Sequence, residues 1–243
     1  MQFRLLTPPT GNPKLSKSSQ GYYPTILHLA PAGVAGLQNV CLYSSPDCRA
    51  ICLYYAGRGG ILESGCNLNN IMRVRIARTR SFLLDKDYFL RELDLDIITG
   101  KSIAKKKGLK FCCRLNGTSD IAFENYSFTD YWGNHQHSIV HKHKDVQFYD
   151  HTKNYNRISE NFIHNLYLLY SYSGYNEHLC KKLLTKGINV AVVFKDKLPE
   201  TFWGYPVFDG DESDLRFLDP QEHIIGLKAK GYAKKIKTKM VID

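Results

Sequence analysis

Long hydrophobic runs are missing from this sequence of 243 residues. Its longest apolar segments, such as residues 189–194 (NVAVVF), are far shorter than the roughly 18 residues of a membrane-spanning helix, so we expect them as buried strands. The first twenty residues contain no apolar segment of the kind found in secretory signal peptides. We therefore expect a cytoplasmic protein that has no membrane partner.

Several common enzyme signatures are absent as well. The chain has no G-x-S-x-G, H-E-x-x-H or G-x-G-x-x-G motif, so an α/β-hydrolase, a zinc protease and a Rossmann dinucleotide-binding protein are not indicated. Hydrophobic residues make up 43% of the chain and charged residues 23%, which is ordinary for a globular protein. That balance excludes a disordered chain, a collagen and a coiled coil.

Acidic residues are outnumbered, with 23 Asp and Glu against 33 Lys and Arg, so the formal net charge is +10. Lysines gather at residues 105–107 and again between residues 228 and 239. This excess is typical of proteins that contact a polyanion such as nucleic acid, although a basic end is often only a solvated segment. Both interpretations stay open on sequence alone.

Seven cysteines, an odd number in a chain without a secretory segment, argue against a disulfide framework. Cys112, Cys113 and Cys180 lie in apolar runs and are expected in the core. Cys41, Cys48, Cys52 and Cys66 are grouped near one another in the sequence, where grouped thiols more often hold a metal or take part in chemistry.

The pattern along the chain divides it into three parts. Residues 1–23 are rich in Pro, Gly and Ser and are expected as an N-terminal arm, residues 24–231 as a single domain, and residues 232–243 as a basic C-terminal tail. Within the domain, we expect strands and helices in alternation. The expected strands are residues 25–29, 109–115, 146–149, 165–171, 189–194 and 222–227, and the expected helices include residues 48–55, 71–82, one capped by Asp85, and 177–186.

Alternating strands and helices predict an α/β fold with a mostly parallel sheet, either doubly wound or a partial or complete (β/α) barrel. Polar residues follow several expected strands in turn, at 116–120, 149–153 and 171–176. The carboxyl ends of barrel strands converge on one face and build the site there. We therefore favour the partial or complete barrel, with the cysteine loop after the first strand.

The cysteine loop has the spacing Cys41-x6-Cys48-x3-Cys52 and runs from the end of the first strand into a helix. Three thiolates this close in sequence can converge on one metal centre, and soft thiolates select zinc or iron–sulfur clusters. Three cysteines fit a [4Fe–4S] cluster with one open iron, whereas a structural zinc site would need Cys66 or a histidine as the fourth ligand. Ordinary core cysteines are the remaining alternative.

Two other strand ends carry candidate site residues. The segment 116–121 (NGTSDI) offers Asn116, Thr118, Ser119 and Asp120 to a cofactor, although the same residues are common in turns. After the next strand, Asp150 and Lys153 are candidates for catalytic proton handling, with a structural ion pair as the alternative. Ser171, at the end of the following strand, is a further candidate for cofactor binding.

Segments spread over nearly the whole chain resemble the phage "gene product eighty-eight" family. They include NVCLYSSPDCRAICLYYAGR, CRLNGTSDI, VQFYDHTKNYNR, YLLYSYSGYN, GYPVFDGDESDLRF and GLKAKG. The resemblance implies a phage-encoded protein that acts in the host cytoplasm. It does not by itself imply an activity.

The order of these features is also similar to that of radical S-adenosylmethionine enzymes, especially phage-type members with an expanded cysteine spacing. This similarity implies a [4Fe–4S] cluster on Cys41, Cys48 and Cys52, S-adenosylmethionine on the open iron, and an electron donor as a partner. With the positive charge, it predicts an enzyme acting on a nucleotide or a nucleic-acid base. The alternative is a zinc-stabilised nucleic-acid-binding accessory protein without catalysis. Neither prediction defines an oligomeric state.

Overall fold

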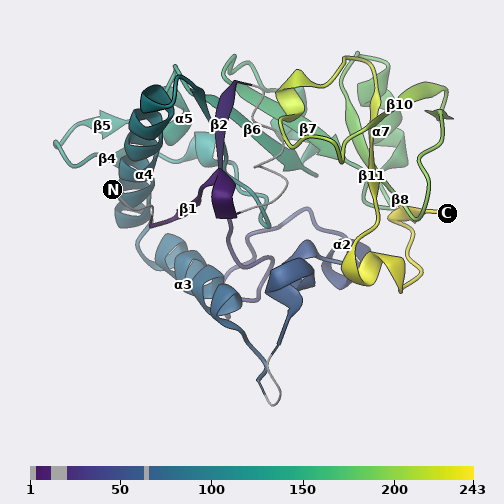
Figure 1. The fold of residues 1–243 in the computed structure, drawn as a ribbon, viewed down its shortest axis with the longest axis horizontal. Helices are drawn as coiled ribbons and strands as arrows, with labels where there is room; N and C mark the ends of the chain where they lie inside the picture. Colours follow the sequence, from purple (N-terminus) through teal and green to yellow (C-terminus); the bar gives the residue numbers. More distant parts are fainter. Residues whose placement is uncertain (1–3, 12–20, 63–65) are drawn as a thin grey trace.

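A large, mostly parallel β-sheet forms the centre of the molecule in this computed structural model, which describes residues 4–11, 21–62 and 66–243 (Figure 1). Its strand order is β1-β2-β3-β6-β7-β8-β11-β10-β9, and β12 pairs with β8. The main strands are β2 (Tyr22–Leu27), β3 (Lys110–Arg114), β6 (Gln147–Thr152), β7 (Leu166–Ser171), β8 (Val190–Phe194), β10 (Tyr205–Asp209) and β11 (Ile224–Lys228).

Short strands complete the sheet at its margins. β1 (Leu6–Thr7) and β9 (Thr201–Phe202) pair antiparallel with β2 and β10, whereas all the other pairs of this sheet, including that of β12 (Val241–Ile242) with β8, are parallel. A separate hairpin is made by β4 (Phe128–Thr129) and β5 (His135–Gln136). Among the described residues, the sheet ends at β1 and β9, so the predicted α/β fold is confirmed but the alternative of a complete barrel is not.

From β2 to β8, successive main strands of the chain are neighbours in the sheet. The order then changes, because β11 lies beside β8 and β10 lies on the far side of β11. The longer connections contain helices. These are α2 (Pro46–Ala50), α3 (Asn70–Leu84), α4 (Lys86–Lys106), α5 (Ile139–Lys142), α6 (Tyr155–Ser159) and α7 (Glu177–Leu184). Short 3-10 turns are η1 (Pro9–Gly11), η2 (Leu53–Tyr55), η3 (Gly57–Gly60), η4 (Phe123–Asn125), η5 (Arg216–Leu218) and η6 (Gly231–Lys234).

Helix α4 packs against the sheet and contributes buried side chains to the main core cluster. Leu90, Leu93 and Ile97 recur at helical spacing and are completely buried, in the same cluster as Phe148 of β6. The predicted cap is confirmed, because the Asp85 side chain accepts a hydrogen bond from the backbone N–H of Tyr88. α3 ends and α4 begins at this residue.

The predicted helix over residues 48–55 is wrong. α2 ends at Ala50, Cys52 has extended dihedral angles, and a separate 3-10 turn begins at Leu53. Just after the end of α2, Ile51 is buried against Ala229 and Ala233 from the other end of the chain. Further on, the Asn69 side-chain amide donates to the carbonyls of Gly59 and Ile61, which ties η3 to the start of α3.

Part of the segment expected as an N-terminal arm packs against the domain. The Asp96 carboxylate, on α4, accepts hydrogen bonds from the backbone N–H groups of Arg4, Leu5 and Leu6, at 2.6 to 3.0 Å. Leu6 is buried in the main core cluster. Residues 1–3 and 12–20 of that expected arm lie outside the described residues.

The basic C-terminal residues also pack into the domain. Ala233 is buried with Ile51, and Lys239 donates its backbone N–H to the Asp47 carboxylate at 2.6 Å. Figure 1 shows the C-terminal residues, drawn in yellow, beside α2, and η6 contacts η2. The Lys-rich end of the chain therefore lies against residues 41–55, which contain Cys41, Cys48 and Cys52 and are called the cysteine segment below. No helix in the described parts of the chain is long and apolar enough to cross a membrane.

Candidate functional site

A cavity of about 570 Å³ lies at the carboxyl ends of the parallel strands. Its wall includes His28 after β2, Asn116 after β3, Lys153 after β6, Tyr172 after β7 and Lys228 at the end of β11. In α/β folds, this end of the strands is where ligand sites are built, because the loops that follow the strands converge there. The polar strand ends expected from the sequence therefore do meet in space.

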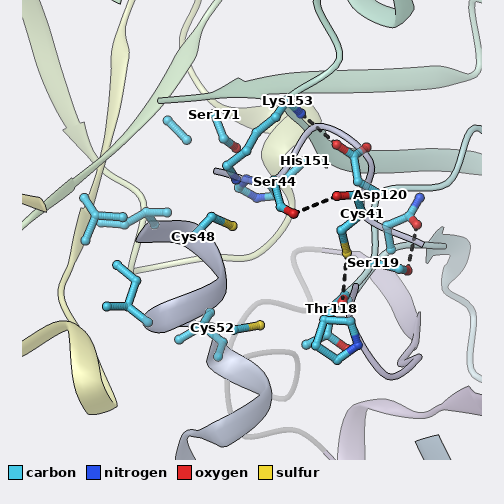
Figure 2. Close-up of a pocket in the computed structure, with 18 of the residues that line it drawn as sticks. Cys41, Ser44, Cys48, Cys52, Thr118, Ser119, Asp120, His151, Lys153 and Ser171 are labelled. Atoms are coloured by element: carbon cyan, nitrogen blue, oxygen red, sulfur yellow. Dashed lines mark hydrogen bonds between the residues drawn. The ribbon is translucent and has the colours of Figure 1, made fainter. Parts of the chain in front are cut away.

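Cys41, Cys48 and Cys52 all line this cavity. Cys48 sits in the first turn of α2, where its backbone N–H donates to the Ser45 hydroxyl at 3.1 Å. That hydroxyl donates in turn to the carbonyl of Ser173 at 2.9 Å, which ties α2 to the loop after β7. In Figure 2, the sulfur atoms of Cys48 and Cys52 point toward the side where Cys41 and Thr118 lie.

The Cys41 thiol is held between two backbone groups. The N–H of Ala32 donates to its sulfur at 3.3 Å, and the thiol donates to the carbonyl of Thr118 at 3.8 Å, a bond drawn in Figure 2. Burial raises the pKa of Cys41 to about 11, and the charges of Cys48 and Cys52 contribute in the same direction. Burial likewise raises the pKa of Cys52. Burial therefore disfavours the thiolate forms of Cys41 and Cys52.

These three thiols do not form a closed metal site as they stand. Within residues 4–11, 21–62 and 66–243, no group of three or more Cys, His, Asp or Glu side chains is arranged to hold a metal ion. We expected the sulfurs to be close enough to share one site, and here they are not. Cys66 does not line the cavity. A metal at Cys41, Cys48 and Cys52 would require their side chains to move toward one another.

The segment 116–121 is an internally bonded loop. The Asn116 side chain accepts from the Ser119 hydroxyl and from the Ile121 N–H, both at 2.8 Å, and donates to the Ile121 carbonyl at 2.9 Å. Thr118 donates its hydroxyl to the carbonyl of Leu29, which joins the loop to the end of β2. All the predicted cofactor-binding residues line the cavity, but several of their polar atoms are used in building its wall.

Asp150 and Lys153, both predicted as catalytic, occupy different environments. Asp150 is 1% exposed and is not part of the cavity wall, and its carboxylate accepts from the Asn116 N–H at 2.7 Å and from the Asn116 amide at 2.8 Å. Burial raises the pKa of Asp150 to about 6, against the opposing effects of Arg157 and Asn116. The contacts of Asp150 make it a positioning residue for the loop.

Arg157 completes this buried network. Its guanidinium donates to both oxygens of Glu124, at 2.6 and 2.9 Å, and lies 3.3 Å from Asp150 and 3.5 Å from Asp120. Asp120 accepts from the backbone N–H of Lys153 at 2.9 Å. The loops after β3 and β6 are therefore locked together by charge, which leaves the Lys153 side chain and Ser171 as the predicted residues best placed to meet a ligand.

Sequence reasoning did not place His28 or any arginine in the cavity wall, which includes Arg49, Arg75, Arg114 and Arg216. His28 falls at the end of an expected strand, so the strand-end argument applied to NGTSDI could also have found it. Arg75 lies on α3, and nothing in the sequence indicates which side of that helix faces the cavity. Arg114 and Asp214 are paired across the wall at 3.4 Å although they are 100 positions apart.

Asn116→Asp tests the positioning role of Asp150. The variant puts a second carboxylate about 2.8 Å from Asp150, so we expect a loss of about 3 kcal/mol in unfolding free energy at pH 7. Repulsion raises the folded-state pKa of one carboxyl above its unfolded value, so the folded variant binds a proton more readily. The deficit should therefore shrink as pH falls from 7 through 6 to 4.

Urea denaturation at each pH measures this difference. Asn156→Asp, the same chemical change at an exposed position, is the matched control and should cost less than about 0.5 kcal/mol. An Asn116→Asp deficit that stays constant from pH 7 to pH 4 would show that Asp150 does not meet the new carboxylate.

The fold and the cavity define a mixed α/β protein with a large, mostly parallel sheet and a candidate site at the carboxyl ends of its strands. The chain belongs to the Gene product 88 family, whose model matches residues 4–243. This match confirms the resemblance to the phage gene product eighty-eight family. It gives no support to the similarity with radical S-adenosylmethionine enzymes. No curated protein and no solved structure matches the chain.

Proposed function

We propose that the cavity is the catalytic site of a radical S-adenosylmethionine-type enzyme, with Cys41, Cys48 and Cys52 holding a [4Fe–4S] cluster. The observation that carries the proposal is that these three cysteines, from one short segment, line the same cavity as the strand ends of β3, β6 and β7. The sequential strand order from β2 to β8 supports a partial (β/α) barrel with the cysteine segment after its first parallel strand.

The donor set suits the cluster chemically. Thiolates are the usual ligands of iron–sulfur clusters. Three thiolate ligands on a four-iron cluster leave one iron without a protein ligand. The raised pKa of Cys41 means that a metal must displace the thiol proton on binding, so the affinity should fall at acid pH. Cys41, Cys48 and Cys52 are only half-buried, and binding a cluster would require their sulfurs to move toward one another.

Cys41, Cys48 and Cys52 would hold the cluster, which together with an external electron donor would supply one-electron reduction of S-adenosylmethionine and, through it, removal of a hydrogen atom from the substrate. The chain supplies binding and orientation. Thr118 and Ser119 fix the wall beside Cys41, and Ser171 faces the same space in Figure 2. Lys153 is placed to hold or move a proton on the substrate, for which a nucleotide or nucleic-acid base fits the positive charge of the chain.

The proposal is tested by incubating anaerobically reconstituted protein with S-adenosylmethionine and a one-electron reductant, and measuring 5′-deoxyadenosine by chromatography. We expect the product to form with the wild type and not with Cys52→Ser. Reconstituted protein that binds iron but gives no 5′-deoxyadenosine above the Cys52→Ser background would contradict the proposed activity.

One observation favours the zinc-stabilised nucleic-acid-binding alternative. η6 and the lysines around it pack against the cysteine segment, so a metal there could organise a basic surface. Against this alternative, Cys66 does not line the cavity, so the fourth ligand expected for a structural zinc site is not with the other three. Nucleic-acid binding that falls steeply with salt and depends on bound zinc would favour it.

A further inference from the structure

Arg75, on α3, places a guanidinium group in the wall of the cavity beside the cysteine segment. Its terminal carbon lies 5.6 Å from the centre of the Tyr54 ring. Gly59 leaves space for it, because a Cβ atom at that position would come within 3.4 Å of the Arg75 Nη1 and within 2.9 Å of the Tyr54 carbonyl. The position of the guanidinium is thus defined by contacts on two sides.

Among the residues that the structure describes, this guanidinium has no counter-charge. Its Nη1 is buried and has no hydrogen-bond partner among the described residues, and no carboxylate pairs with it there. Burial lowers the pKa of Arg75, and the nearest groups that oppose this effect are Tyr54 and Cys52 rather than an acid. Holding a cation out of water without a partner costs free energy, which an anionic ligand would recover.

The surroundings of Arg75 are positive. His28 shares the cavity wall, and burial together with the charges of Arg75, Arg114 and Arg78 lowers the pKa of His28 to about 3. Arg114 pairs with Asp214 at 3.4 Å, but Arg75 has no such partner in the described chain. At neutral pH, His28 is therefore an uncharged imidazole that can donate one hydrogen bond and accept another, in the same cavity wall as Arg75.

We infer that Arg75 binds a phosphate group of the substrate in this cavity, with His28 beside it. A guanidinium group can donate hydrogen bonds to two oxygens of one phosphate at the same time, which fixes where the phosphate binds. Surface lysines attract phosphate by charge but do not fix its position. Arg75 also lies close enough to Cys52 to act on its charge, so the phosphate sits next to the cysteine segment. The inference rests on the proposal that this cavity is the substrate site, and it does not require a metal.

Metal-free wild-type protein is titrated calorimetrically with three probes: a mixture of nucleoside monophosphates, a ten-nucleotide single strand and inorganic phosphate. We expect at least one probe to bind and Arg75→Gln to weaken its binding about tenfold or more. A nucleotide response identifies a free nucleotide as the source of the phosphate, a response to the strand alone identifies nucleic acid, and a response to inorganic phosphate alone supports the phosphate site itself.

Arg73→Gln is the matched control. Arg73 lies on the same helix and carries the same charge, but it is exposed and is not part of the cavity wall. It should change binding by less than about twofold for the small probes, because exposed charges are screened by salt. Arg75→Lys keeps the positive charge but loses the paired N–H donors of the guanidinium, so it should bind the phosphate probe with intermediate affinity. This variant also serves as the test if Arg75→Gln folds poorly.

Two results would overturn the inference: no binding of any phosphate probe to the wild type, or equal losses of binding in Arg75→Gln and Arg73→Gln. Because metal-free protein is used, a failure here is separable from a failure of the cluster proposal, which is judged by iron content. Without ligand, Arg75→Gln should unfold at the same temperature as the wild type or higher, since it removes a half-buried cation that has no acidic partner in the described part of the chain.

Discussion

Cys48→Ser is expected to lose at least nine-tenths of the iron that the wild type retains after anaerobic reconstitution. Serine keeps the size of the side chain but removes a thiolate ligand, and two remaining thiolates do not hold a four-iron cluster. The fold should survive, because Cys48 is only partly buried and its backbone N–H keeps its bond to Ser45. Iron content per chain and the absorption spectrum measure the effect.

Cys66→Ser is the control for this experiment. Cys66 is also partly buried, but it does not line the cavity that Cys41, Cys48 and Cys52 share. It should therefore retain the wild-type iron content. Equal iron in Cys48→Ser and the wild type, with both proteins folded, would contradict the assignment of Cys48 as a ligand.

Arg157→Met should cause the largest loss of stability of any single substitution considered for this chain. It leaves Glu124, Asp150 and Asp120 without their shared cation, and uncompensated buried charge commonly costs about 3–5 kcal/mol. A domain of this kind has only about 5–15 kcal/mol of unfolding free energy, so the variant should be close to unfolded at moderate temperature. Urea denaturation at pH 7 measures the change.

A surface pair provides the comparison. Lys181→Gln breaks the ion pair with Glu177 on α7, where both side chains are about half exposed at 51% and 49%, and it should cost less than about 0.5 kcal/mol. If Arg157→Met costs no more than Lys181→Gln, the buried network does not hold the loops after β3 and β6 together. In that case Asn116 and Asp120 would need another explanation for their fixed positions.

Local signals in the sequence were enough for the main strands and helices. The apolar run 189–194 became β8, and Asp85 caps α4, because both features depend on residues close together in the chain. The end of the expected helix at Ala50 was not predictable, since no Gly or Pro follows it in residues 51–55 and the next residue, Ile51, packs against Ala229 and Ala233 from the other end of the chain. The same holds for Leu6, which is fixed by Asp96 some 90 positions away.

The candidate site likewise contains residues that the sequence predicted and residues that it did not. The rule that parallel strands gather their carboxyl ends correctly indicated that NGTSDI, Lys153 and Ser171 would meet the cysteine segment. It could not indicate that Asp150 turns into the protein to hold Asn116, because a strand end does not define which side its last residues face. The place of Arg75 could not be predicted for a related reason, because it arises from the packing of α3 beside η2 and η3.

The metal and sulfide content of the wild type, purified without oxygen and examined with its visible absorption spectrum, tests the central claim most directly. We predict brown protein with about four irons and a similar amount of sulfide per chain, bound through Cys41, Cys48 and Cys52. Colourless protein with one zinc per chain and no iron after reconstitution would contradict the cluster and favour the zinc-stabilised alternative.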